Sequence, residues 1–292
     1  MDIEFLGESG NIVPVKGAFV TYPVFDCFPY YCEKELLRFR YELYKDLVDA
    51  HFVLEADRTQ SGAYKGFHAL EHIQELGLDQ DRIQVIHIEV PEGERGVGDN
   101  WVRERGQRDA LSVALEALPE PTIVIQSDCD EFLDPDKLPF LINEARKHEV
   151  VHPAMNLHYV RADYLVVDAI NNEPIEWYGP TLSRNLGFKK YGTYSQMRNC
   201  PPADRLHTYA DVTFGHHFCW TGGKEARTYK LKSMALQYKD QEEALKNIEE
   251  FSLDTMKEML EPQNQTILSY DVNLLPGAIT GNKQMMQYLL SD

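Results

Sequence analysis

The strongest constraint on the fold is the alternation of apolar β-rich runs with helical patterns along the first half of the chain. Runs typical of buried strands cover residues 18–25, 50–56, 82–90 and 122–128. Helical periodicity lies between them, at about residues 33–48, 67–76 and 100–118. Strands that alternate with helices in this way predict crossover connections. We therefore expect an α/β fold of Rossmann-like type, with a mostly parallel central sheet flanked by helices.

The second half of the chain follows a different pattern. After about residue 150 come short β-like pieces rich in Tyr, His, Asn and Gly, which we expect to be antiparallel or irregular. A charged helical pattern runs from Gly223 to about Leu260, and residues 282–290 predict a last helix. We expect one continuous domain with a C-terminal helical appendage, divided into residues 1–17, 18–150, 151–240 and 241–292.

The charge balance restricts the possible ligands. The 292 residues carry 29 basic and 47 acidic side chains, and 29 − 47 gives a net charge of −18. Such a chain is poorly suited to nonspecific binding of nucleic acid or of an anionic membrane surface. An anionic ligand would need a local basic pocket or a metal ion.

Cysteine usage and the N-terminal sequence indicate the compartment. The five cysteines are odd in number and scattered, with no CxxC pair, so reduced thiols are expected. The N-terminal segment contains acidic residues where a signal peptide needs a basic start and an apolar core, and no run of about 18 apolar residues occurs. We therefore expect a cytoplasmic protein without an integral membrane segment.

Three acidic residues follow the strand at residues 122–128. They are Asp128, Asp130 and Glu131, at the carboxyl end of a buried strand, which is where open α/β sheets bind ligands. Asp128 and Asp130 point the same way in an extended chain, and their oxygen atoms suit a hard divalent ion that also holds phosphates. Alternatively, these carboxylates only solvate a strand end or cap the next helix.

A pair of histidines forms a second candidate cluster. Alternation along the segment at residues 215–220 sends His216 and His217 to opposite faces of a strand, so only one of them faces a site. A neutral imidazole suits Mn²⁺ and similar ions, and His217 or His216 would complete coordination begun by Asp130. A hydrogen-bonded core histidine is the alternative for either residue.

Three motifs along residues 20–240 belong together: the segment at residues 24–65, the Ser-Asp-Cys-Asp-Glu run at residues 127–131, and Gly215-His216-His217. In this order they resemble glycosyltransferase family 17, the family of the β-1,4-mannosyl-glycoprotein 4-β-N-acetylglucosaminyltransferases. Further matching positions are Asp26, Glu33, Arg40, Glu55, Lys65, Arg103, Glu104, Arg108, Trp177, Gly179, Arg198 and Lys230.

The resemblance implies a transferase of the GT-A type, inverting, with UDP-GlcNAc as donor, Mn²⁺ or Mg²⁺ as cofactor and a glycan or glycoconjugate as acceptor. Residues 18–150 would then bind the nucleotide sugar, and residues 151–240 would complete the metal and acceptor sites. Asp130 and His217 would hold the metal, with Asp128 reaching the ribose or the metal. The predicted donor-binding residues are Asp26, Glu55, Asp57, Lys65, Arg108, Asp128 and Lys230.

Inversion requires a general base that takes the proton of the acceptor hydroxyl. Glu225, just after a Gly-containing loop, is the first candidate, and Asp211 is the second. Two other classes of protein remain open. A metal-dependent nucleotidyltransferase or sugar-phosphate hydrolase would use the same paired acids, and a noncatalytic glycan-binding protein would keep the fold without the chemistry.

Overall fold

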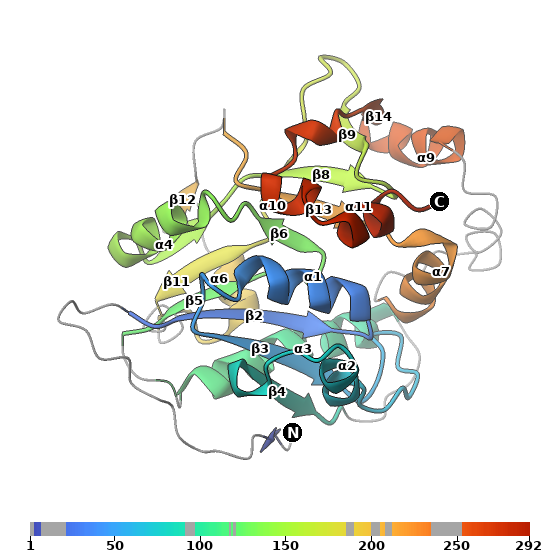
Figure 1. Cartoon of the computed structure of the whole chain (residues 1–292). Coiled ribbons are helices and arrows are strands. Elements are labelled where there is room, and N and C mark those ends of the chain that lie inside the picture. The colour runs from blue at the N-terminus through green and yellow to red at the C-terminus, as the bar shows by residue number, and fades with distance from the viewer. Residues whose placement is uncertain are drawn as a thin grey trace.

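A computed structural model of the chain contains two β-sheets with helices packed on and between them (Figure 1). The structure describes residues 3–6, 22–90, 97–116, 118, 121–184, 190–199, 205–207, 212–234 and 253–292.

The first sheet is built around four parallel strands. They are β2 (Val24–Tyr30), β3 (Ala50–Ala56), β4 (Ile83–Ile88) and β5 (Ile123–Gln126). Their order in the sheet is β4-β3-β2-β5, and every neighbouring pair is parallel. This confirms the α/β fold with a mostly parallel sheet that the alternating pattern predicts.

Further strands extend this sheet at both edges. Antiparallel β1 (Ile3–Leu6) pairs with β4, so part of the expected N-terminal extension joins the sheet. On the other side β11 (Thr181–Arg184) runs antiparallel between β5 and β7 (Val150–His152), followed by β12 (Arg205–His207). The sheet therefore takes strands from both sides of residue 150, and the division of the chain there stays a proposal.

Helices cover both faces of the parallel strands. Helices α1 (Lys34–Tyr44) and α2 (Ala69–Glu75) pack on one face together with Phe28 and Tyr30 of β2. Helix α3 (Val97–Glu116) packs on the other face with Phe25 and Cys27, and α6 (Tyr194–Arg198) lies beside it. The period-two alternation of β2 thus assigns each of its side chains to one helical layer.

The second sheet has the order β14-β9-β8-β13-β6, with β10 paired to β8. Its strands are β6 (Glu131–Leu133), β8 (Met155–Tyr159), β9 (Tyr164–Asp168), β10 (Glu176–Trp177), β13 (Gly215–Cys219) and β14 (Gln265–Ser269). Strands β8 and β13 are parallel, and the other pairs are antiparallel. Since β6 starts right after the acidic turn and pairs with β13, the two predicted metal-binding segments become neighbours.

The remaining helices include α4 (Leu138–Lys147), which packs on β5, β7 and β11 of the first sheet, and the helices of the C-terminal part of the chain. The others are α7 (Gly223–Ser233), α9 (Leu253–Leu260), α10 (Gly277–Thr280) and α11 (Lys283–Leu289), with 3₁₀ turns at Gln80–Arg82, Glu261–Gln263 and Val272–Leu274. The C-terminal segment is helical as expected and also contributes β14. Helix α11 buries Met285 and Leu289 in the core under α1.

Two predicted boundaries need correction. The first buried strand, predicted over residues 18–25, is β2, which begins at Val24 and ends at Tyr30; residues 18–21 lie outside the described part of the chain. Asp26 lies within this strand, where Arg40 neutralises its charge inside the protein. The helical pattern from Gly223 gives α7, which ends at Ser233; residues 235–252 of that pattern lie outside the described part of the chain.

Candidate active site

A buried arginine organises the acidic turn that follows β5. The alternation of β2 places Asp26 on the face covered by α1, where Arg40 meets it in a two-pronged ion pair. Arg40 Nη2 lies 2.6 Å from Asp26 Oδ1, and Arg40 Nε lies 2.7 Å from Asp26 Oδ2. Burial alone would raise the pKa of Asp26, but Arg40 and a hydrogen bond with His51 lower it to about 2. Both side chains of the pair are completely buried.

The other donors of Arg40 hold the turn itself. Arg40 Nη1 donates to the carbonyl oxygens of Asp128 (3.0 Å) and Glu131 (2.8 Å), and Nη2 donates to Ser127 Oγ (2.5 Å). Arg40 therefore fixes both ends of the turn that carries Asp128 and Asp130. Asp26, predicted as a donor-binding residue, lies beneath this turn and acts on it through Arg40.

Glu131 fixes the same turn from its other side. Glu131 Oε2 accepts from the backbone nitrogen of Asp128 (2.7 Å), and Oε1 accepts from Trp177 Nε1 (2.5 Å). A Cβ atom at Gly179 would lie 1.9 Å from Glu131 Oε1, so only glycine leaves room for this contact. Glu131 is fully buried, and its two bonds make it a support for the turn.

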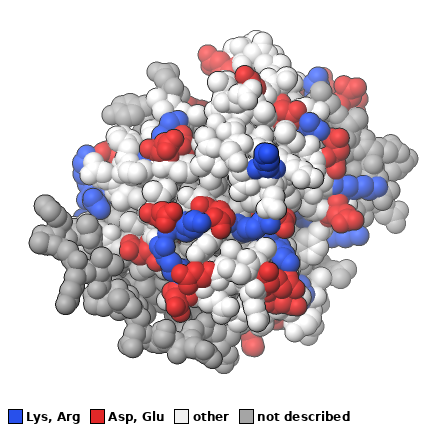
Figure 2. Space-filling model, viewed as in Figure 1, with Lys and Arg blue, Asp and Glu red and all other residues white. Residues whose placement is uncertain are grey.

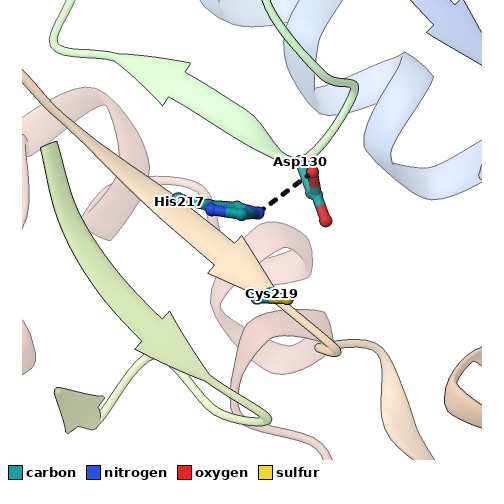
Figure 3. Close-up of side chains that lie close together, drawn as sticks. All are labelled: Asp130, His217 and Cys219. Carbon is teal, nitrogen blue, oxygen red and sulfur yellow. Dashed lines mark ion pairs between the residues drawn. The ribbon is translucent and has the colours of Figure 1, made fainter. Parts of the chain in front are cut away.

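Asp130 and His217 face each other between the turn and β13 (Figure 3). Asp130 Oδ1 lies 3.5 Å from His217 Nε2, and Asp130 Oδ2 accepts from Lys230 Nζ on α7 at 2.6 Å. Cys219 is two residues after His217 on the same face of β13, and one ligand atom from each of Asp130, His217 and Cys219 lies within 4.8 Å of the others. His216 points the opposite way and hydrogen-bonds His158 at 2.9 Å.

The protonation of this cluster follows from its charges. Burial alone would raise the pKa of Asp130, but Lys230 and His217 lower it well below its usual range. Burial alone would lower the pKa of His217, whereas Asp130 raises it well above 6.5. Asp130 is thus a stable anion paired with two cationic side chains, and a metal cation bound to its carboxylate would take the place of the proton on His217.

Two arginines converge on Asp128. Arg108 of α3 lies 2.6 Å from Asp128 Oδ1, and Arg198 of α6 lies 3.8 Å from the same atom. Burial alone would raise the pKa of Asp128, but Arg108 and Arg198 lower it to about 2. Arg108 was predicted as a donor-binding residue, while Arg198 was noted only as a matching position. Arg198 is far from the other site residues in the sequence, so the sequence analysis did not place it beside Asp128.

Three other predicted donor-binding residues, Glu55, Asp57 and Lys65, form a separate network after β3. The Glu55 carboxylate accepts from Lys65 Nζ (2.9 Å) and from the backbone nitrogens that begin α2, at His68 and Ala69. Asp57 Oδ1 accepts from the backbone nitrogen of Val90. Glu55 is completely buried, so in this arrangement the network shapes the loop.

A pocket of about 360 Å³ opens beside Asp130 and Lys230. Its walls come from the segment after β2, from α7 and from Tyr288 of α11. Glu33 lines it, and burial raises the pKa of its carboxyl group; Glu33 Oε2 accepts from the backbone nitrogen of Tyr31 at 2.6 Å. The sequence analysis noted Glu33 only as a position that matches the family and did not select it as a site residue. The signal available was its position right after a parallel strand.

The two residues predicted as the general base have different outcomes. Glu225 lies exposed on α7 and is not among the residues that line this pocket. Asp211 lies outside the described residues. Both remain predictions. Acidic and basic side chains are interspersed on the face shown in Figure 2, so the net negative charge does not form one broad acidic surface there.

Solved structures of sugar-transferring and related enzymes show low similarity. The chain is 13% identical to glucosyl-3-phosphoglycerate synthase from Mycobacterium tuberculosis with Mn²⁺, UDP and glucosyl-3-phosphoglycerate (TM-score 0.34; 89% of this chain, 92% of that chain). Another structure of that synthase is matched over 44% of its length and 48% of this chain, with 18% identity and a TM-score of 0.27. A galactosyltransferase with donor and acceptor sugar analogues is 10% identical (TM-score 0.36; 64% and 73%).

Comparison with the sequence models of protein families identifies the family of this chain, whereas the solved structures show only low similarity. No curated protein matches the chain. No helix among the described residues is long and apolar enough to cross a membrane. The sequence model of glycosyltransferase family 17 matches residues 18–182, which include β2 to β5 and the acidic turn with Asp128 and Asp130. Because this match covers more than half of the chain, the protein belongs to glycosyltransferase family 17.

Proposed function

We propose that this member of the family is an inverting, metal-dependent glycosyltransferase that moves a sugar from a UDP-sugar to a hydroxyl group of a glycan or glycoconjugate. UDP-GlcNAc is the first donor to test, because the sequence resembles a family of N-acetylglucosaminyltransferases. The observation that carries the proposal is the convergence of Asp130, His217 and Lys230 beside a pocket, at the carboxyl end of a parallel strand.

The residues at the centre fit a divalent cation such as Mn²⁺. Asp130 supplies an anionic oxygen and His217 an imidazole, and these groups already face each other at 3.5 Å. Asp128, predicted as a further ligand, points to Arg108 and would reach the cation through water or contact the ribose. A bound cation would neutralise charge on the departing diphosphate.

The basic side chains around the turn fit the diphosphate of the donor. Lys230 is about one third exposed at its side chain and reaches Asp130 from α7, so its ammonium group borders both the cation position and the pocket. Arg108 and Arg198 present guanidinium groups at Asp128, and such groups bind phosphate oxygens in pairs. In the absence of a donor, the aspartates balance these charges.

Glu33 fits the role of the general base better than Glu225. It lines the same pocket as Asp130, whereas Glu225 is exposed on α7. Backbone hydrogen bonds orient its carboxylate, including one from Tyr31 to Oε2, and this carboxylate would accept the proton of an acceptor hydroxyl. Its raised pKa makes the carboxylate a stronger base than an exposed glutamate.

The experiment is UDP release from a panel of UDP-sugars, with glycan acceptors, in Mn²⁺, Mg²⁺ or EDTA. We expect one sugar to be turned over with metal, Asp130→Ala to abolish turnover, and Asp136→Ala, which changes an exposed acid after β6, to behave like the wild type. Release of pyrophosphate or free phosphate would instead identify a nucleotidyltransferase or hydrolase. Glycan binding that survives Asp130→Ala, without turnover, would identify a binding protein.

Cytoplasmic location remains a prediction that cell fractionation tests.

A further inference from the structure

Cys219 is placed beside the proposed cation site by the geometry of β13. Residues two apart on a strand project from the same face, so His217 and Cys219 both face the turn that carries Asp130 (Figure 3). One ligand atom from each of the three residues lies within 4.8 Å of the other two. Cys219 is a free, half-buried thiol, so its sulfur is available to a metal ion.

We propose that the Cys219 thiolate is the third protein ligand of the cation, which makes this a site for a borderline-soft ion of the Zn²⁺ and Co²⁺ kind in preference to Mg²⁺. This inference deepens the proposed function, on which its catalytic meaning rests. Thiolate and imidazole ligands favour Zn²⁺ and Co²⁺, whereas Mg²⁺ is selected by sites made of oxygen atoms alone.

The neighbouring groups support this assignment. His217 is 6% exposed, and its side chain interacts with Cys219 as well as with Asp130. Lys230 holds Asp130 Oδ2, so Oδ1 remains directed at His217. The site therefore already contains an oriented carboxylate, an imidazole and a thiol on two neighbouring strands.

The spacing needs only a small adjustment. In a tetrahedral site with metal–ligand distances of about 2.0–2.3 Å, the ligand atoms lie roughly 3.5 Å apart. The three ligand atoms now lie within 4.8 Å of one another, so they would have to move closer together to bind one ion. Cation binding would release the thiol proton to solvent as the sulfur–metal bond forms, and the proton on the ligating nitrogen of His217 would leave to solvent in the same step. Three protein ligands leave a fourth position open, as in catalytic zinc sites, where a phosphate oxygen of the donor would bind.

The test is spectroscopic and does not require activity. Metal-free protein is titrated with Co²⁺, and the near-ultraviolet thiolate-to-cobalt charge-transfer band is recorded together with Zn²⁺ affinity by competition. We expect a band that saturates at one Co²⁺ per chain in the wild type and vanishes in Cys219→Ser, with Zn²⁺ affinity at least about tenfold weaker. Cys32→Ser, which alters another half-buried thiol, is the matched control and should keep the band.

Each remaining outcome decides the question. A band that persists in Cys219→Ser, or Co²⁺ binding without a thiolate band, overturns the assignment, as does a failure of folded wild-type protein to bind Co²⁺. Cys219→Asp should restore metal binding without the band and shift preference toward Mn²⁺. The band together with absence of sugar transfer would retain the ligand assignment and overturn the proposed function. Mn²⁺-dependent sugar transfer without the thiolate-to-cobalt band would support the proposed function and overturn the assignment of Cys219 as a ligand.

Discussion

Replacing Arg40 by lysine separates the geometry of the buried arginine from its charge. Arg40 makes five hydrogen bonds, two to Asp26 and one each to Ser127, Asp128 and Glu131. An ammonium group has three donors at one point, so at least two of the five bonds are lost. With about 1.5 kcal/mol for each bond to a charged donor, Arg40→Lys should lower the free energy of unfolding by about 3 kcal/mol.

Urea unfolding followed by circular dichroism measures this loss. With a slope of about 3 kcal/mol per M, the midpoint should fall by about 1 M. Arg38→Lys is the matched control, since Arg38 is on the same helix and pairs with the partly exposed Glu35; its midpoint should change little. Equal midpoints for Arg40→Lys and Arg38→Lys would refute the claim that the geometry of Arg40 holds the acidic turn.

Three further predictions concern packing, protonation and catalysis. Gly179→Ala should lower the free energy of unfolding by about 1–3 kcal/mol, because the new Cβ collides with Glu131 Oε1. Gly277→Ala, where a Cβ meets nothing within 4 Å, is its control in the same urea assay. The pKa of Asp26 falls from 3.8 to about 2 on folding, so this group contributes about 2 kcal/mol above pH 4 that is lost as the pH drops toward 2. Unfolding measured against pH should show a weaker acid loss in Asp26→Asn, and an unchanged slope would contradict the prediction. Glu33→Gln should reduce kcat about 100-fold or more with UDP affinity unchanged. Because burial raises the pKa of Glu33, the acid limb of the wild-type rate should lie above that of an ordinary glutamate and vanish in the variant; a limb that remains would exclude Glu33 as the base.

Much of the fold is predictable because it depends on local pattern. Strand β3 occupies the predicted residues 50–56, and α2 and α11 lie within their predicted ranges. The strand β2 was misplaced because the sequence does not show that Arg40, fourteen residues later, will neutralise Asp26. Neutralisation of a buried charge is a tertiary property, and periodicity alone does not reveal it.

The candidate site shows the same division between local and tertiary information. Asp130 and His217 were selected by residue type and position, and the structure brings them together. Glu33 and Cys219 were not selected, because an acid after a strand and a single cysteine are common features. Their place at the site becomes visible only in the folded protein, where β6 pairs with β13 and α7 forms a wall of the pocket.

The central claim is that the centre at Asp130 binds a nucleotide diphosphate through a divalent cation. Calorimetric titration of UDP into metal-free protein, with and without Mn²⁺, tests this most directly. The account predicts that Mn²⁺ strengthens UDP binding at least about tenfold, a coupling free energy of about 1.4 kcal/mol, and that Asp130→Ala removes this gain. Equal UDP affinity with and without the cation, in wild type and Asp130→Ala alike, would contradict it.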